Sequence, residues 1–206
     1  VAVHYYWMGA TVSALLVFGP EGQVAEFAAN RTRIDVAAFN HANSRMVIGT
    51  SDGIVCLAQW PPPSAQENES ASSPANEGPK ICFDDNWPAS SLEGSSATAL
   101  TRLAGDFNAD IACAAFSPED TMLAVASADS ALFLYNVDNG KPIGRACMLD
   151  SPAVALLFTG DEKRVLAITM EGMAHIFDIA TTAKPCFRGM EHGSALLGMH
   201  LSKDEA

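Results

Sequence analysis

Residues 111–141 read IACAAFSPEDTMLAVASADSALFLYNVDNGK, and this stretch decides the fold. Three short apolar runs, at 111–116, 121–127 and 131–137, are separated by turn-forming residues. The first turn contains a proline that presets φ and two acidic residues, and the second is short enough for a tight hairpin. The stretch therefore predicts three consecutive antiparallel strands.

The same plan occurs in two further copies. Phe39, Phe116 and Phe158 each close the first apolar run of a copy, and an acidic turn residue follows thirteen positions later. Two of these acidic residues, Asp129 and Glu171, are 42 residues apart. A period near that length, made of short strands and tight turns, is typical of a β-propeller blade. The strands of the two further copies are predicted at 34–39, 45–50, 54–60, 153–158, 164–169 and 173–179.

We therefore predict an all-β chain with the β-propeller fold and about four to five visible blades. The blades are expected within 1–60, as a partial first blade and one at 31–60, and within 101–206. The second region divides into 101–145, 146–188 and the start of another blade at 189–206. A ring of seven such blades would need roughly 290 residues, so the prediction is an incomplete ring.

The segment 61–100 interrupts the repeats. It opens with three prolines and contains six acidic residues and one lysine, with many serines. Low hydrophobicity combined with net charge predicts an acidic insert that is largely disordered. The apolar residues Ile81, Cys82, Phe83 and Trp87 are exceptions. They are expected to form either the outer strand of a blade or a short anchor.

The repeats resemble those of the WD-repeat family of β-propellers. The match includes Phe116-Ser117-Pro118 and a hydroxyl residue two positions before each acidic turn residue, giving the pairs Thr50 and Asp52, Ser127 and Asp129, and Thr169 and Glu171. The resemblance implies that these six residues are structural and brace the blade turns, rather than forming an acid/base set. The chain is a divergent member in this interpretation, because the family's Trp-Asp slot holds Ala58-Gln59, Tyr135-Asn136 and Phe177-Asp178. The family's histidine has a counterpart only at His192.

Charge and cysteine content restrict the possible partners and the compartment. The net charge is −12 and the lysines and arginines are scattered, which argues against direct nucleic-acid binding and favours a basic protein surface. No apolar run reaches the length of about 18 residues that a membrane span needs. The five cysteines are odd in number and lack metal-site spacing, so we expect reduced thiols and a cytoplasmic or nuclear protein.

The sequence offers no candidate for catalysis. It lacks a phosphate-binding glycine loop, a nucleophile elbow and a zinc-protease histidine pair, so we expect no catalytic residue, cofactor or metal. The function predicted is a non-catalytic scaffold that docks protein partners in a multi-protein assembly. Two alternatives stay open at this point. One is a propeller enzyme, hydrolase-like, with polar residues facing the channel, and the other is a component of an RNA particle such as a ribosome biogenesis factor.

Overall fold

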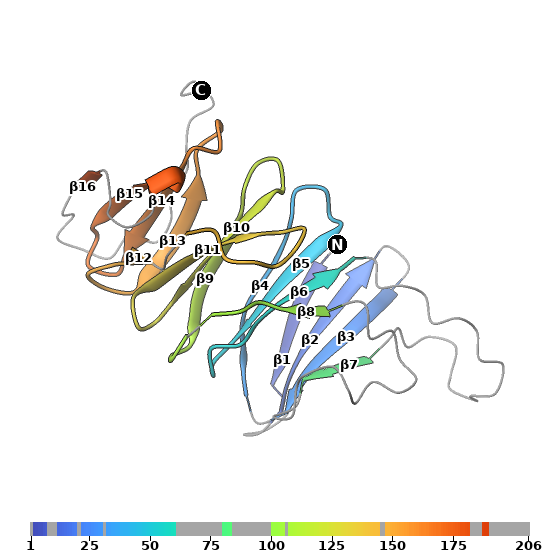
Figure 1. The fold of residues 1–206 in the computed structure, drawn as a ribbon. Coiled ribbons are helices and arrows are strands. Elements are labelled where there is room, and N and C mark those ends of the chain that lie inside the picture. The colour runs from blue at the N-terminus through green and yellow to red at the C-terminus, as the bar shows by residue number, and fades with distance from the viewer. Residues whose placement is uncertain are drawn as a thin grey trace, which may run out of the picture.

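The computed structural model describes the backbone of residues 2–7, 12–19, 22–30, 32–60, 80–83, 100–105, 107–144, 147–181 and 187–189. Side chains are described within 32–60, 101–105, 107–144 and 147–181. This described part consists of β-strands and one short 3-10 helix, η2 (Ile179–Thr181). The strands form four sheets of four strands each, which stand in series along the chain (Figure 1). The predicted all-β fold is thereby confirmed.

The first sheet has the strand order β1 (Ala2–Trp7), β2 (Val12–Gly19), β3 (Gly22–Asn30) and β7 (Lys80–Phe83). The first three strands are antiparallel, whereas β7 runs parallel to β3. Within the predicted range 1–60 this first copy has three strands, β1 to β3. The outer strand of the sheet, β7, comes from the 61–100 segment, and Ile81 of β7 lies opposite Phe27 of β3. Apart from β7 and Leu100, that segment lies outside the described residues, and so does the predicted disorder.

The other three sheets repeat one antiparallel plan. The second sheet contains β4 (Ile34–Phe39), β5 (Arg45–Thr50), β6 (Val55–Gln59) and β8 (Leu100–Arg102). The third contains β9 (Ile111–Phe116), β10 (Met122–Ser127), β11 (Ala131–Asn136) and β12 (Cys147–Met148). The fourth contains β13 (Ala153–Phe158), β14 (Arg164–Thr169), β15 (Ala174–Asp178) and β16 (Phe187–Gly189). The first strands of adjacent sheets lie side by side, β4 against β9 and β9 against β13 (Figure 1).

Side chains on the two faces of the third sheet fill the cores that it shares with the second and fourth sheets. On β10, Leu123 and Val125 face the second sheet, in a core with Val47 and Leu57. The alternate residues of β10 face the fourth sheet, in a core that also contains Phe177. This alternation follows from the two-residue period of a strand. Because both faces are covered, the strand reads as a continuous apolar run, as the sequence pattern indicated.

A β-bulge recurs at the start of the first strand in the three repeats with described side chains. Ile34 pairs with Thr50 and Val36 with Gly49, so Asp35 is the extra residue. The register shifts in the same way around Ala112 in β9 and around Val154 in β13. A bulge takes its extra residue out of the ladder and redirects its side chain. These three residues therefore occupy one equivalent position.

Hydrogen bonds between turns join neighbouring sheets at one end. The carboxylate of Asp120, in the β9–β10 turn, accepts from the backbone N–H groups of His41 and Ala42 at 2.8 Å each. It also accepts from the Asn40 side-chain amide at 3.0 Å. Burial opposes ionisation, but the hydrogen bonds from His41 and Ala42 outweigh it and hold the pKa of Asp120 below its usual value. Asp120 thus ties the third sheet to the second.

Glu162 makes the equivalent contact one repeat later, in the β13–β14 turn. Its carboxylate accepts from the backbone N–H of Glu119 at 2.7 Å and from the Thr121 hydroxyl at 2.9 Å. Asp120 and Glu162 both have a positive φ, at 61° and 54°. Asn43 holds the corresponding place in the β4–β5 turn with φ 53°. Asparagine and aspartate tolerate this left-handed conformation better than most residues, which explains Asn43 and Asp120, whereas glutamate has no such preference.

Replacing Asp120 by asparagine is expected to lower the free energy of unfolding by about 1–3 kcal/mol at pH 7, because a charged acceptor of several N–H groups is lost. The folded pKa lies below the unfolded one, so this contribution is present above about pH 4 and is lost as the pH falls through the folded pKa. Urea titrations at pH 7 and pH 3 would measure it, and the difference between wild type and variant should shrink at pH 3.

Asp138→Asn is the control for this prediction. The Asp138 side chain is 81% exposed and its ion-pair partner, Arg45 Nη2, is 3.6 Å away. Exposed ion pairs contribute little, so the control should differ from wild type by less than about 0.5 kcal/mol at either pH. An equal loss in both variants would show that Asp120 has no special role between the sheets.

Candidate functional site

The six residues predicted to brace the blade turns lie at the opposite end of the sheets, in and before the second hairpin of each repeat. In the second sheet, the Thr50 hydroxyl donates to the carboxylate of Asp52. The same hydroxyl oxygen accepts from the backbone N–H of Ile54 at 3.1 Å. Thr50 is 1% exposed, so these bonds satisfy a buried hydroxyl while closing the hairpin.

The third sheet has the fuller version of this arrangement. The buried Ser127 hydroxyl donates to Asp129, whose carboxylate also accepts from the backbone N–H groups of Ala131 and Asn108 at 3.2 Å each. Burial works against ionisation of Asp129, but these hydrogen bonds prevail and lower its pKa. Asp129 therefore connects its own hairpin to the segment that leads into β9.

In the fourth sheet the structure does not bring the predicted pair together. The Thr169 hydroxyl oxygen is bonded to the backbone of Met173, accepting from its N–H at 3.2 Å. Within the described part of the chain, the side chain of Glu171 makes no such bond to Thr169. Gly172 in this hairpin has φ 80°, as Gly53 has φ 79° in the second sheet. Glutamate is one methylene longer than aspartate, so its carboxylate is poorly placed to accept from the adjacent N–H groups in a tight turn.

This difference between repeats predicts a contrast between two conservative substitutions. Asp129→Asn should lower the free energy of unfolding by about 1–3 kcal/mol, because a charged acceptor of three hydrogen bonds is lost. Glu171→Gln should change it by less than about 0.5 kcal/mol, as exposed substitutions usually do. Urea denaturation of both variants at pH 7 would compare them. A larger loss in Glu171→Gln would mean that the glutamate braces its turn after all.

The Trp-Asp slots contain residues that pack or cap. Tyr135 and Phe177 are 0% and 1% exposed and belong to the cores between sheets. Asn136 accepts from the backbone N–H groups of Asp138 and Asn139 at 3.1 Å each, which closes the turn after β11. His192, the counterpart of the family histidine, lies outside the described residues.

A pair missed by the sequence interpretation joins the fourth sheet to the segment before it. Nε2 of His175 lies 2.7 Å from Oδ1 of Asp150, and His175 is 3% exposed. His175 stands where the third sheet has Phe133, and its ring stacks on Phe177 with centroids 6.2 Å apart. Its Nδ1 is buried and makes no hydrogen bond within the described part of the chain. The histidine thus holds residues 149–152 against β15.

The described cysteines are unsuited to nucleophilic chemistry. Burial raises the pKa of the Cys56 and Cys113 thiols to about 12 and that of Cys147 to about 11. A thiol with such a pKa is protonated at neutral pH, and the protonated thiol is a poor nucleophile. All three are free cysteines. Cys82 and Cys186 have no described side chains.

The described part of the chain lacks two further features. Among its residues, no group of three or more His, Cys, Asp or Glu side chains could hold a metal ion. No helix within it is long and apolar enough to cross a membrane.

Comparison with known proteins supports the fold. No model of a known protein family matches the sequence, and no curated protein matches it. A chain in "Crystal Structure of Mitotic Checkpoint Complex" is 17% identical with a TM-score of 0.60, and the match covers 93% of this chain and 52% of that one. The computationally designed Ika8 protein is 14% identical with a TM-score of 0.62, over 98% of this chain and 53% of the other.

The chain therefore spans about half the length of both similar structures. At these identities the likeness concerns the fold alone. It supports the predicted WD-like β-propeller, with this chain as a propeller-like set of sheets.

Proposed function

We propose that this chain is a WD-repeat propeller segment that acts as a non-catalytic scaffold, docking protein partners in a multi-protein assembly. The observation that carries the proposal is the use of polar groups at the hairpin end. Thr50, Ser127 and Asp129 are bonded to groups of their own hairpins and neighbouring segments. Side chains engaged in this way order the loops that would present a docking surface.

Inter-sheet contacts provide the rigidity that a docking surface needs. Asp120 and Glu162 each join the turns of two adjacent sheets. A surface that is already ordered loses less conformational entropy when a partner binds. One of the two similar structures is that of an assembly, the mitotic checkpoint complex, which is a precedent for this fold within a complex.

We further propose that the four sheets belong to a larger ring. On β14, Val165 and Ala167 pack in the core with the third sheet, while Leu166 and Ile168 lie on the other face. The corresponding face of β10, with Ala124 and Ala126, is covered by the fourth sheet. Ile168 is already buried at 5% exposed, whereas Leu166 is only half-buried, so a further blade would complete the cover of Leu166, in keeping with the half-length match to the solved structures.

The compartment proposed is the cytoplasm or nucleus, in keeping with the free thiols of Cys56, Cys113 and Cys147.

Affinity purification of the tagged protein from its own cells, followed by mass spectrometry at low and at moderate salt, tests the proposed scaffold function. We expect a defined set of stoichiometric protein partners that survives moderate salt. A destabilised variant serves as control for proteins that bind unfolded chains. Recovery of the protein alone would contradict the proposal, and co-purified stoichiometric RNA would favour the RNA-particle alternative.

A further inference from the structure

We infer that the surface formed by Met148, Val154 and Met170, here called the methionine surface, docks a basic amphipathic segment of a protein partner. The inference rests on the proposed scaffold function and adds the place of binding and the chemistry of the partner.

The three side chains are unusually exposed for their type. Met148 is 65% exposed, Met170 58% and Val154 40%, and they are the large hydrophobic residues found exposed in the described part of the chain. Single exposed hydrophobics are ordinary on a protein surface, but a group of them indicates an interaction site. Methionine is common in such sites because its flexible, polarisable side chain adapts to different apolar partners.

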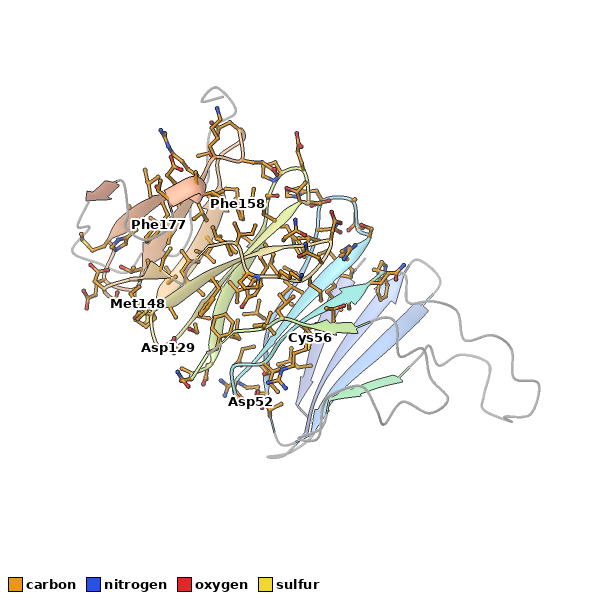
Figure 2. All side chains as sticks on the ribbon, in the orientation of Figure 1. Asp52, Cys56, Asp129, Met148, Phe158 and Phe177 are labelled. Atoms are coloured by element: carbon orange, nitrogen blue, oxygen red, sulfur yellow. The ribbon has the colours of Figure 1, made fainter. Side chains whose placement is uncertain are left out.

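All three lie along the segment that crosses from the third sheet to the fourth. Met148 is in β12 at the start of this crossing and pairs with Ala131. Val154 comes directly after the crossing, at the bulge of β13. The backbone N–H of Met170 donates to the carbonyl of Pro152 at 2.8 Å, which places Met170 beside the end of the crossing. Met148 lies near Asp129 on the hairpin side of the third sheet (Figure 2).

The fold itself does not need large apolar side chains at these positions. Ser51 and Ala128 are the counterparts of Met170, since their N–H groups donate to the carbonyls of Arg33 and Asp110 in the same way. The counterparts of Val154 at the bulge are Asp35 and Ala112. Small or polar residues thus serve the same backbone geometry in the other repeats. The methionine and valine are additions of the fourth repeat, and binding is a reason for them.

The crossing beneath this surface is held in place. Leu149 is buried and its N–H donates to the Ser130 carbonyl at 2.9 Å. Asp150 is bonded to the buried His175, and the neighbouring Ser151 is 7% exposed. The exposed side chains therefore stand on an ordered segment, and docking would not have to order it first.

The charges around the methionine surface select a basic partner. Asp129, Asp150 and Glu171 lie in the two hairpins and the crossing that surround it. Six acidic residues and one basic residue, Arg33, lie at this end of the second, third and fourth sheets. They belong to the second hairpins and to the segments that lead into the first strands, at 32–35, 51–54, 107–111, 128–130, 149–153 and 170–173. Arg33 is bonded to two of those carboxylates, Asp35 and Asp110. Like charge disfavours an acidic segment here, whereas lysines beside apolar anchors complement this surface.

The test uses the full chain and three synthetic peptides of equal length, titrated by fluorescence anisotropy. One peptide is helical and built from Leu and Lys, the second replaces every Lys by Glu, and the third replaces every Leu by Ser. We expect binding of the Leu/Lys peptide alone, weakened when the salt is raised from about 50 mM to about 300 mM because screening increases. The M148S/M170S variant should bind it at least tenfold more weakly.

Gln59→Ser is the matched control. Gln59 is exposed at the end of β6 that lies away from the second hairpin, and its side chain is similar in length to that of methionine. It should bind the Leu/Lys peptide as wild type does. Both variants should unfold at the wild-type urea concentration, because they change only exposed side chains. Equal affinity of wild type and M148S/M170S would overturn the inference, as would equal binding of the Leu/Glu peptide.

Two further results separate the surface from the scaffold function. If M148S/M170S still captures the same stoichiometric partners as wild type, the scaffold stands and the methionine surface is not the docking site. If neither form captures a partner, the scaffold itself fails. Sedimentation of the protein without peptide tests self-association. If wild type is a dimer and M148S/M170S is a monomer, the methionine surface binds a second copy of the chain, and the inference of a basic partner is overturned.

Discussion

Replacing Phe177 by alanine is expected to lower the free energy of unfolding by about 3–5 kcal/mol. Phe177 is 1% exposed in the core between the third and fourth sheets, packed with residues such as Leu134 and Val165. Removal of the ring loses its burial and leaves a cavity that rigid sheets on both sides cannot fill. A domain is stable by only about 5–15 kcal/mol, so this one change removes a large fraction of the total.

Urea denaturation followed by tryptophan fluorescence would measure this loss, because Trp60, one of three tryptophans, is 8% exposed and changes environment on unfolding. Met170→Ala, at a side chain 58% exposed, is the control and should change the stability by less than about 0.5 kcal/mol. A loss below about 1 kcal/mol for Phe177→Ala would mean that the third and fourth sheets do not pack as described.

The second large effect is expected for Gly53→Ala, with a loss of about 2–5 kcal/mol. Gly53 has φ 79°, and a Cβ at this position would lie 2.5 Å from the backbone carbonyl oxygen of Phe107. The left-handed conformation costs an alanine roughly 1–2 kcal/mol, and overpacking adds about 1–3 kcal/mol. The contact cannot be relieved by a rotamer change, because the oxygen belongs to the backbone of the segment between β8 and β9.

Ser130→Ala gives the matched control for Gly53→Ala. Ser130 holds the equivalent place in the next hairpin with φ 68°, so that turn already accommodates a Cβ. Thermal unfolding of the two variants should show a clear drop in midpoint for Gly53→Ala and little change for Ser130→Ala. Equal midpoints would show that the close approach of Phe107 is not maintained in solution.

Local turn chemistry made much of the repeat predictable. The hairpins that join β9, β10 and β11 follow from apolar runs and turn residues that lie close together in the chain. The predicted limits agree with the structure for five strands, those at 34–39, 45–50, 111–116, 153–158 and 164–169. The contact of Ser127 with Asp129 joins residues only two positions apart. Such contacts depend on short segments that each repeat contains in full, so a single copy is enough to suggest them.

The contacts between repeats were beyond this kind of reasoning, although one signal was present. Asp120 and Glu162 are 42 residues apart, and each lies four positions after the phenylalanine that closes the first strand of its repeat, so the repeat alignment could have marked them as equivalent. Their partners could not be named, because the choice of neighbour depends on how two sheets pack. The same limit applied to His175, whose partner Asp150 is 25 residues away in a crossing segment.

The sequence by itself determined the first three strands of the second, third and fourth sheets and the hairpins that join them, because side-chain period and turn preferences act over a few residues. It did not predict their short fourth strands, β8, β12 and β16. Only the tertiary structure decided that β7 joins the first sheet and which apolar residues stay exposed. It also decided that Asp120 accepts a hydrogen bond from the backbone of His41, 79 residues away in the chain. Those outcomes depend on packing between sheets, where the energy of a contact is set by a neighbour that is distant in the chain. Met148 and Leu149 show the difference, since adjacent apolar residues of one segment are 65% and 7% exposed.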